Sequence, residues 1–273
     1  MTFSASSPST REPGGRRGHR PPPRPVEVVA VERLAPRIVS VLFGGASLAG
    51  FTPPLPTAHI KLFLPDADGE VAAPTVGPDG LSWPTGRPTM RTYTPRRFDA
   101  AALTLEVQFV LHGDGPAAQF ARDAVPGDRA AIGGPGGRFS VDPAGRDWWI
   151  GGDDSALPAI ATLIEALPTD ARVRVEVEVA GPGDRIALPA HPGAQLHWHD
   201  RGTGDWGGEL LDAVRGSHLD PQTDVWVACE AAAVRRIRRH LLDERGLPSA
   251  QVTTRGYWQA GQANHPDHDF GED

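Results

Sequence analysis

The stretch Met90-Arg91-Thr92-Tyr93-Thr94-Pro95-Arg96 places one aromatic residue between two arginines and beside a threonine. The Tyr93 ring offers a flat apolar face on which a flavin ring can stack. Thr94 adds a hydroxyl and a backbone N–H for the N5 edge of that ring. Arg91 and Arg96 carry planar guanidinium groups that match the geometry of a pyrophosphate. The spacing of these residues fits a flavin-binding site. It also fits the alternative of a strand end with a buried tyrosine and two surface arginines.

Length and composition indicate a folded protein of about two domains. The chain has 273 residues, of which 39% are hydrophobic and 22% are charged, so a large apolar core can form. Its net charge of −7 argues against nucleic acid as a partner, because duplex binding requires many cations that neutralise phosphates.

Cys229 is the only cysteine of the chain, which excludes an internal disulfide and a metal centre built from several cysteines. A single thiol also fits a reducing compartment. No apolar run approaches the roughly 20 residues needed to span a membrane, and the N-terminus lacks the apolar region of a signal peptide. We therefore expect a cytoplasmic protein without membrane insertion.

The chain changes character near residue 26. Residues 1–25 are rich in Ser, Pro, Gly and Arg and predict a disordered tail, because they cannot bury enough surface to offset their ordering entropy. Residues 26–145 contain short β-rich runs separated by Pro and Gly, among them the alternating run Leu103–Val110. Many short strands with few helices predict an antiparallel β-barrel, and this domain carries the flavin-like stretch.

The residues that follow this run, Leu111–Ala121, predict a loop that opens into a helix. Gly113 and Gly115 come shortly before Pro116, and proline is favoured in the first turn of a helix. The free N–H groups at such a helix start can bind a phosphate, although a turn without a ligand fits the same pattern. The run Gly133–Gly137 precedes no helix and is interpreted as an interdomain loop.

Strand-like and helix-like segments alternate from residue 146 to residue 273. This alternation predicts a mainly parallel α/β sheet of the kind that binds NAD(P)H. Ligands of such sheets lie beyond the carboxyl ends of the strands, where we place Gly151–Ser155 and Cys229–Glu230. The expected fold class is therefore a two-domain β plus α/β protein, with a flavin-binding antiparallel barrel followed by a mainly parallel sheet.

Four sequence landmarks lie in these two domains, at residues 91–96, 112–117 (His-Gly-Asp-Gly-Pro-Ala), 152–159 (Gly-Asp-Asp-Ser-Ala-Leu-Pro-Ala) and 256–258 (Gly-Tyr-Trp). Together they resemble the siderophore-interacting proteins, flavin-dependent ferric-siderophore reductases of the ferredoxin-NADP reductase superfamily. The resemblance covers nearly all of the chain after the tail. The first landmark is shared by many flavin reductases, whereas residues 112–117 and 256–258 are more specific to this family.

The resemblance implies FAD as the cofactor and assigns contacts to individual residues. The predicted contacts are Arg91, Thr92, Tyr93, Thr94 and Arg96 at the flavin and its phosphates; His112, Gly115, Pro116, Ala117 and Ala118 at the pyrophosphate and adenosine; Asp153, Asp154, Ser155 and Ala156 beside the nicotinamide; and Glu230, Tyr257 and Trp258 near both. The sequence departs from the family where Ala118 replaces a common serine and where Cys229 replaces the usual glycine before Glu230.

The resemblance also implies the reaction, in which a nicotinamide reduces the flavin and the flavin reduces iron(III) held by a siderophore. The protein binds and orients while the cofactor carries out the redox chemistry, so no catalytic proton-transfer residue is assigned. Iron(II) binds hard oxygen ligands less tightly than iron(III), so reduction releases the metal. The expected partners are a ferric siderophore and an electron donor, which is NADH, NADPH or ferredoxin.

Other functions and details remain open at the level of sequence. A general flavin reductase, another electron-transfer protein of the superfamily, or a non-catalytic siderophore or flavin carrier fits much of the pattern. NADPH would require arginines near its 2′-phosphate, and the second strand of the α/β domain offers Arg172, Arg174 and Arg185 without fixing one of them there. His197 and His199 are two residues apart, but no third metal ligand lies near them in sequence, so no metal site is predicted.

Overall fold

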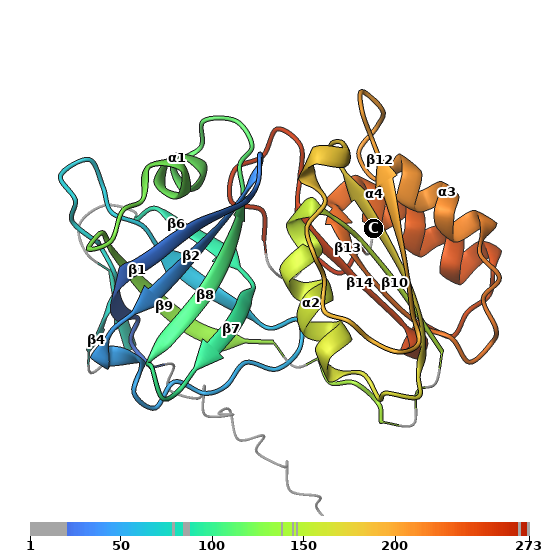
Figure 1. Cartoon of the computed structure of the whole chain (residues 1–273), viewed down its shortest axis with the longest axis horizontal. Helices are drawn as coiled ribbons and strands as arrows, with labels where there is room; N and C mark the ends of the chain where they lie inside the picture. The colour runs from blue at the N-terminus through green and yellow to red at the C-terminus, as the bar shows by residue number, and fades with distance from the viewer. Residues whose placement is uncertain are drawn as a thin grey trace, which may run out of the picture.

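The computed structural model describes residues 21–77, 80–83, 88–137, 139–143, 145, 147–266 and 269–271. It contains two halves that lie side by side, one built on an antiparallel sheet and the other on a parallel sheet with helices (Figure 1). Residues 1–20 of the predicted disordered tail lie outside the described part of the chain. The first strand begins at Arg24, so the last two residues of the predicted tail belong to the sheet.

The N-terminal half confirms the predicted antiparallel barrel. Its elements are β1 (Arg24–Ala35), β2 (Ile38–Gly44), a 3-10 turn (Ala46–Leu48), β3 (His59–Phe63), β4 (Thr75–Gly77), β5 (Gly80–Ser82), β6 (Met90–Tyr93), β7 (Pro95–Asp99), β8 (Thr104–Val110), α1 (Pro116–Asp123) and β9 (Arg129–Gly136). The main sheet has the order β6-β3-β9-β1-β2-β8-β7. The edge strands β6 and β7 are separated in the chain only by Thr94, so the sheet must curl until its two edges meet.

The barrel core follows from the period of its strands. Along β8, the side chains of Leu105, Val107 and Phe109 are fully buried, and the residues between them are half-buried. Such alternation places every second side chain on the inner face of the sheet. The sequence expectation of an alternating strand over residues 103–110 is therefore confirmed.

The prediction that Gly133–Gly137 forms an interdomain loop was wrong. Most of this run belongs to β9, which pairs with β3 in an antiparallel ladder. A Cβ atom on Gly136 would lie 2.5 Å from Nε2 of His59, so glycine is needed because the imidazole covers the strand at this position. Strands β4 and β5 form a small antiparallel hairpin between β3 and β6.

The C-terminal half confirms the predicted parallel sheet. Its elements are β10 (Asp147–Asp153), a 3-10 turn (Asp154–Ala156), α2 (Leu157–Ala166), β11 (Arg172–Val179), a 3-10 turn (Pro182–Asp184), β12 (Ala194–Asp200), α3 (Gly208–Gly216), β13 (Asp224–Glu230), α4 (Ala231–Arg239), a π-helical turn (His240–Glu244), a 3-10 turn (Ser249–Gln251) and β14 (Val252–Trp258). None of the helices in the described ranges is both long and apolar enough to cross a membrane.

All strand pairs of this second sheet are parallel, in the order β12-β11-β10-β13-β14. The chain begins at the central strand β10, runs outward through β11 and β12, and returns to the other side of β10 with β13. The carboxyl ends of β10 and β13 therefore form the switch point at which open α/β sheets bind their ligands.

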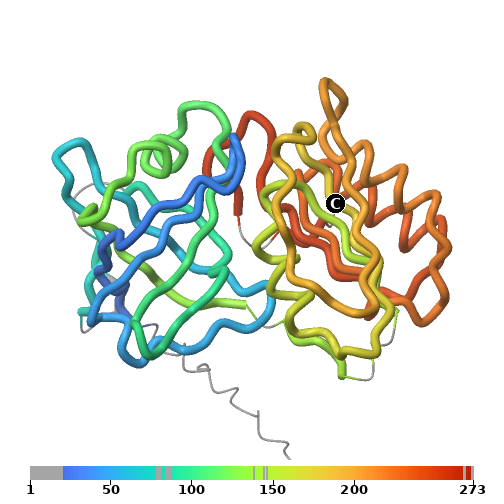
Figure 2. Tube along the Cα trace, viewed as in Figure 1, coloured from blue at the N-terminus to red at the C-terminus, as the bar shows by residue number. Residues whose placement is uncertain are grey.

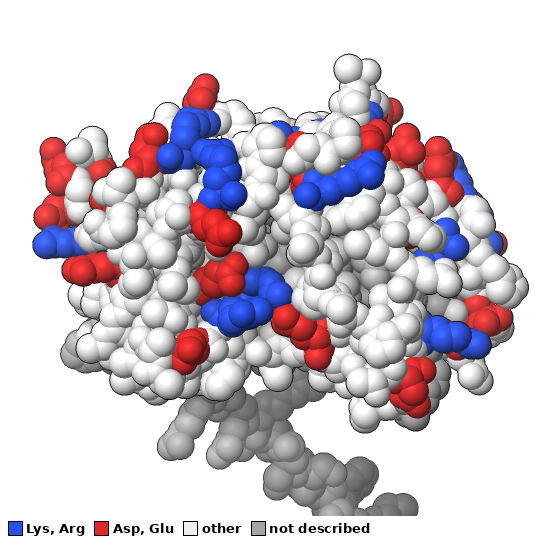
Figure 3. All heavy atoms as spheres, viewed as in Figure 1, with Lys and Arg blue, Asp and Glu red and all other residues white. Residues whose placement is uncertain are grey.

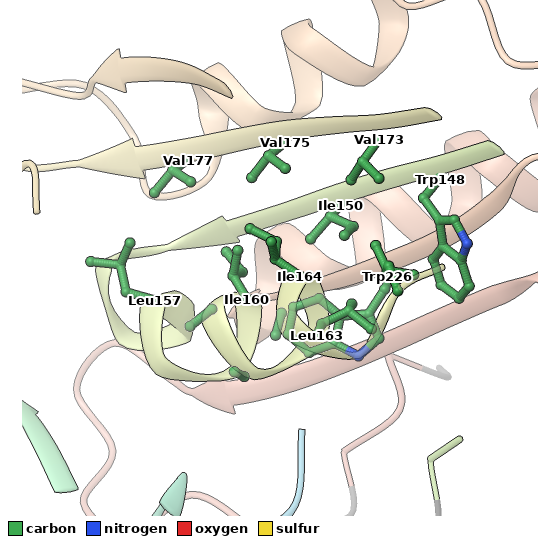
Figure 4. Close-up of a cluster of buried hydrophobic side chains, with 14 of the residues drawn as sticks. Trp148, Ile150, Leu157, Ile160, Leu163, Ile164, Val173, Val175, Val177 and Trp226 are labelled. Carbon is green, nitrogen blue, oxygen red and sulfur yellow. The ribbon is translucent and has the colours of Figure 1, made fainter. Parts of the chain in front are cut away.

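Helix α2 covers one face of this sheet and faces the barrel, whereas α3 and α4 cover the other face (Figures 1 and 2). Figure 4 shows how one side of α2 lies on the sheet, with the apolar side chains of Ile160, Leu163 and Ile164 directed at Ile150 and Trp226. Burial of these large side chains supplies the main stabilisation of the layer.

The two halves are joined by polar contacts along α2. The guanidinium of Arg96 donates two hydrogen bonds, of 2.9 and 2.8 Å, to the carboxylate of Glu165 on this helix. The backbone N–H of Thr57 donates to Oγ1 of Thr162 at 3.1 Å.

Acidic and basic side chains are interspersed over the face shown in Figure 3, so the net charge of −7 is not concentrated in one patch on that face.

The close approach of α2 to β10 depends on Gly152. A Cβ atom there would lie 2.7 Å from Cβ of Ala156, 2.9 Å from Cδ1 of Ile160 and 3.0 Å from the carbonyl oxygen of Ala228. Gly152→Ala should therefore lower the free energy of unfolding by about 1–3 kcal/mol, as measured by urea denaturation. Gly181→Ala is the control, because Gly181 has extended backbone and no atom near its Cβ position. Equal stability of the two variants would contradict this packing.

Candidate functional site

The predicted flavin stretch crosses the line where the barrel closes. Arg91 and Tyr93 lie on β6, Thr94 is the buried residue between the two edge strands, and Arg96 lies on β7. The Tyr93 ring packs against Phe109 with a centroid separation of 4.4 Å. Burial raises the pKa of the Tyr93 hydroxyl although the nearby Arg91 charge opposes this shift, so the tyrosine is neutral.

Two residues of the stretch have contacts other than those predicted. Nζ of Lys61 donates to Oγ1 of Thr92 at 2.7 Å, and Thr92 points to the opposite face of β6 from Tyr93 because side chains alternate along a strand. The Arg96 guanidinium is held by Glu165. The predicted flavin contacts of Arg91, Tyr93 and Thr94 stay predictions.

Helix α1 lies next to this stretch and begins without a side-chain cap. Its N-cap is Gly115, no side chain bonds to its first N–H groups, and Pro116 occupies its first turn. Phe120 of α1 packs 6.3 Å from Phe109, which in turn contacts Tyr93. Since a Cβ atom on Gly115 would meet no atom within 4 Å, the helix start is open to an approaching group. An uncapped helix start can bind a phosphate group such as one in the pyrophosphate of FAD.

The other predicted contacts of α1 line its first turn. Ala117 and Ala118 are buried against the barrel, with 8% and 6% of their surface exposed. The His112 ring lies in the loop before α1 and stacks on Trp258 with a centroid separation of 6.3 Å and an interplanar angle of 25°. The loop that precedes α1 therefore contacts the last strand of the parallel sheet.

A second contact joins the barrel closure to the same strand. The Tyr257 hydroxyl is hydrogen-bonded to the side chain of Thr94, and burial raises the pKa of Tyr257 to about 12. Figures 1 and 2 show the segment around the end of β14, in red, at the junction between the two halves. Landmarks separated by more than 100 residues in the sequence are thus brought together at one place.

Asp153 connects this junction to the switch point of the parallel sheet. Its Oδ2 accepts hydrogen bonds from Nε1 of Trp258 at 2.8 Å and from the backbone N–H of Glu230 at 3.1 Å. Its Oδ1 accepts bonds from the backbone N–H of Ser155 at 3.0 Å and from Oγ of Ser155 at 2.5 Å. One buried carboxylate therefore holds the ends of β10, β13 and β14 in fixed positions.

The environment of Asp153 shifts its titration toward neutral pH. Burial and the charge of Asp154 raise its pKa from 3.8 to about 7, against the hydrogen bonds from Ser155 and Trp258. Burial also raises the pKa of Asp154, and Arg37 and Arg201 partly offset this effect. Oδ2 of Asp154 lies 3.5 Å from Nη1 of Arg37. A perturbed pair of acids at a switch point is a common feature of functional sites.

Glu230 has a structural contact that the sequence analysis did not assign to it. Its Oε2 accepts bonds from the backbone N–H groups of Ala232 and Ala233, at 2.7 and 3.0 Å, and so caps α4. Its Oε1 accepts a bond from the backbone N–H of Ala260 at 3.2 Å. The carboxylate thus stabilises the helix start and the chain after β14. Its predicted contact with a cofactor stays a prediction.

Cys229 and Ala156 are buried residues of this edge. Cys229 is fully buried, and burial together with the nearby acids Asp153 and Glu178 raises the pKa of its thiol, so it remains a neutral apolar side chain. Ala156 is fully buried at the start of α2. Its small side chain lets the helix approach the sheet.

Sequence reasoning did not predict the contacts that two arginines, Arg37 and Arg201, make at this site. Arg37 follows β1 in the barrel and pairs with Asp154 of the second sheet. The Arg201 guanidinium lies 3.5 Å over the Trp206 ring, and the Trp206 ring packs at 4.7 Å against Trp258. Arg37 and Asp154, like Trp206 and Trp258, are distant in the chain, so no local spacing could identify these two contacts.

His197 and His199 both contact the buried carboxylate of Glu176. Nδ1 of His197 lies 3.1 Å from Oε1, and Nε2 of His199 lies 2.5 Å from Oε2. Nε of Arg174 donates to Oε1 as well, at 2.5 Å. In the part of the chain that the structure describes, no group of three or more His, Cys, Asp or Glu residues is arranged to hold a metal ion.

Comparison with known protein families agrees with this geometry. Residues 27–139 match the family model described as "Siderophore-interacting FAD-binding domain". Residues 146–261 match the model described as "Siderophore-interacting protein". The chain belongs to the siderophore-interacting protein family, and its barrel half is the FAD-binding domain.

Individual relatives cover nearly the same residues. An uncharacterized protein of Mycobacterium tuberculosis is 38% identical over 86% of this chain and 90% of its own length. The NADPH-dependent ferric-chelate reductase of Escherichia coli is 30% identical over 87% of this chain and 93% of its own length. The crystal structure of a siderophore utilization protein from T. fusca has a TM-score of 0.82 at 38% identity, and the match covers 90% of this chain and 96% of that one.

The raised pKa of Asp153 predicts a pH-dependent stability. Because the pKa rises from 3.8 to about 7 on folding, the folded chain binds this proton more tightly than the unfolded chain. The contribution of Asp153 to the free energy of unfolding is therefore full below pH 3.8 and is lost as the pH rises through about 7. Urea unfolding of the wild type should show this decline.

Asp153→Asn is the comparison, because the amide does not titrate in this range. The variant should show a shallower decline in stability with pH than the wild type. An NMR titration of the Asp153 carboxyl carbon gives the midpoint without a substitution. A midpoint near 4 together with parallel stability profiles would contradict the proposed effect of burial.

Proposed function

We propose that this chain reduces iron(III) in ferric siderophores, with FAD as its cofactor and a nicotinamide nucleotide as the electron donor. The observation that carries the proposal is the meeting of Thr94 with Tyr257 and of His112 with Trp258. These contacts place the flavin-binding part of the barrel against the switch point of the parallel sheet, where such sheets bind nucleotides.

In this proposal, different residues of the barrel contact different parts of FAD. Tyr93 provides the stacking face, Thr94 lies at the position predicted for the N5 edge, and Arg91 with the uncapped start of α1 faces the pyrophosphate. A bound flavin would accept two electrons together from a nicotinamide and release them singly to iron, chemistry that no amino-acid side chain supplies. The protein residues bind, orient and exclude water.

The proposed reduction of iron does not require an iron ligand from the protein. Iron(II) is held less tightly than iron(III) by the hard oxygen ligands of a siderophore, so electron transfer alone releases the metal. The cytoplasm, where a released iron(II) ion stays reduced, is the compartment that we propose for this reaction. Ferredoxin remains an alternative donor in this proposal, since the final step depends only on reduced flavin.

An anaerobic absorbance experiment tests the proposal. The purified protein should take up FAD and show flavin bands, NADH or NADPH should bleach them, and a ferric siderophore should restore them while an iron(II) chelator develops colour. Rapid nucleotide oxidation with free flavin but none with ferric siderophores would identify a general flavin reductase instead. A yellow protein that no donor bleaches would identify a carrier, and a protein unable to bind FAD would overturn the assignment.

Substitution of Tyr93 tests where the flavin ring lies. Tyr93→Ala should weaken FAD binding by about 1 kcal/mol or more beyond the loss of buried area, because it removes the stacking face. Tyr93→Phe is the matched control and should retain most of the affinity. The measurement is a titration of the apoprotein with FAD, followed by quenching of flavin fluorescence. Equal affinity of the Ala and Phe variants would show that the ring lies elsewhere.

A further inference from the structure

The carboxyl end of β11 bears on which nicotinamide nucleotide the chain accepts. In sheets with this strand order, the second strand ends near the adenosine ribose of the nucleotide. An acidic residue there suits the free 2′-hydroxyl of NADH, whereas an arginine there accommodates the 2′-phosphate of NADPH. Strand β11 is the second strand of this sheet, so the charges at its end are informative.

The arginines that the sequence offers for a 2′-phosphate are held by acidic side chains. Nη2 of Arg172 donates to Asp147 at 2.8 Å, at the amino end of β11 and away from the switch point. Arg174 is bound to the buried Glu176 within the strand. Neither of these two guanidinium groups lies at the end of the strand where a nucleotide would bind.

Arg185 is the candidate at the correct end of the strand, and it is paired as well. Its Nη2 donates to Oδ2 of Asp200 at 2.6 Å, and its Nε donates to Oδ1 at 3.3 Å. Asp200 is in register with Val179, the last residue of β11, so the ion pair marks the carboxyl ends of both strands. The two side chains are 38% and 36% exposed, which places them within reach of a ligand.

Arg201, the next residue after β12, is not available to a phosphate. Its side chain is only 6% exposed, and Nη1 lies 3.7 Å from Oε1 of the fully buried Glu178. The guanidinium is also covered by the Trp206 ring at 3.5 Å. After β11 the chain adds another buried acid, Asp184, which accepts a bond from the backbone N–H of Arg37 at 3.2 Å.

We propose that the carboxyl end of β11 discriminates against a 2′-phosphate, so that this chain takes electrons from NADH in preference to NADPH. The inference rests on the proposed function and adds the identity of the donor. A 2′-phosphate would have to compete with Asp200 for Arg185, whereas a 2′-hydroxyl carries no charge and can accept the ion pair as it stands. The E. coli relative is named for NADPH, so the two proteins should differ in donor.

Calorimetric titration of the FAD-loaded protein with NAD⁺ and NADP⁺ tests this preference without any turnover. In the wild type, NADP⁺ should bind about fivefold or more weakly than NAD⁺. Asp200→Asn frees Arg185 and should tighten NADP⁺ binding about tenfold, the scale of one new hydrogen bond to a charged group, with NAD⁺ binding unchanged. Adding Arg185→Ala to this variant should remove the gain.

Asp212→Asn is the matched control. It removes the same charge from another exposed Asp–Arg pair, Asp212 with Arg215 on α3, and should change neither affinity. Wild-type NADP⁺ binding as tight as that of NAD⁺, failure to bind either nucleotide, or an Asp200→Asn variant with unchanged NADP⁺ affinity would each overturn the inference. Reduction of a ferric siderophore by chemically reduced, protein-bound FAD needs no nucleotide, so that reaction tests the proposed function separately.

Discussion

The buried carboxylate of Asp153 fixes the strand ends of the parallel sheet that meet the barrel. It accepts hydrogen bonds from Ser155, Glu230 and Trp258, which come from three different parts of the chain. Trp258 in turn stacks on His112 of the barrel. Because the carboxylate is buried, loss of one partner would leave a polar group without compensation at a cost of about 1–3 kcal/mol. Trp258, which Asp153 positions, is therefore one of the residues that join the switch point to the barrel.

Helix α1 of the barrel and helix α4 of the parallel sheet begin differently. In the barrel, α1 begins at Gly115 without a side-chain cap. In the parallel sheet, Glu230 caps α4 and the carboxylate of Glu178 accepts a bond from the backbone N–H of Gly207, just before α3. A free helix start attracts a phosphate, and a start that already holds a carboxylate does not. The start of α1 is therefore the place that we propose for the FAD pyrophosphate, whereas the start of α4 is not open to a phosphate.

The sequence predicted those features that depend on local pattern. The alternation of Leu105, Val107 and Phe109 predicted β8, and the order of strands and helices predicted the parallel sheet. Local pattern could not show that Gly136 of β9 lies under the His59 ring, since His59 is distant in the chain. It also could not show that Arg96 binds Glu165 on α2. Each miss concerns a side chain whose partner is set by tertiary packing.

A single-turnover experiment tests the central claim most directly. Protein-bound FAD is reduced chemically, the reductant is removed, and the sample is mixed anaerobically with a ferric siderophore and an iron(II) chelator. The account predicts that about two iron(II) ions form for each flavin that is reoxidised, because the flavin gives up two electrons and each iron takes one. Flavin that stays reduced in the presence of every ferric siderophore class, with no iron(II) formed, would contradict the account.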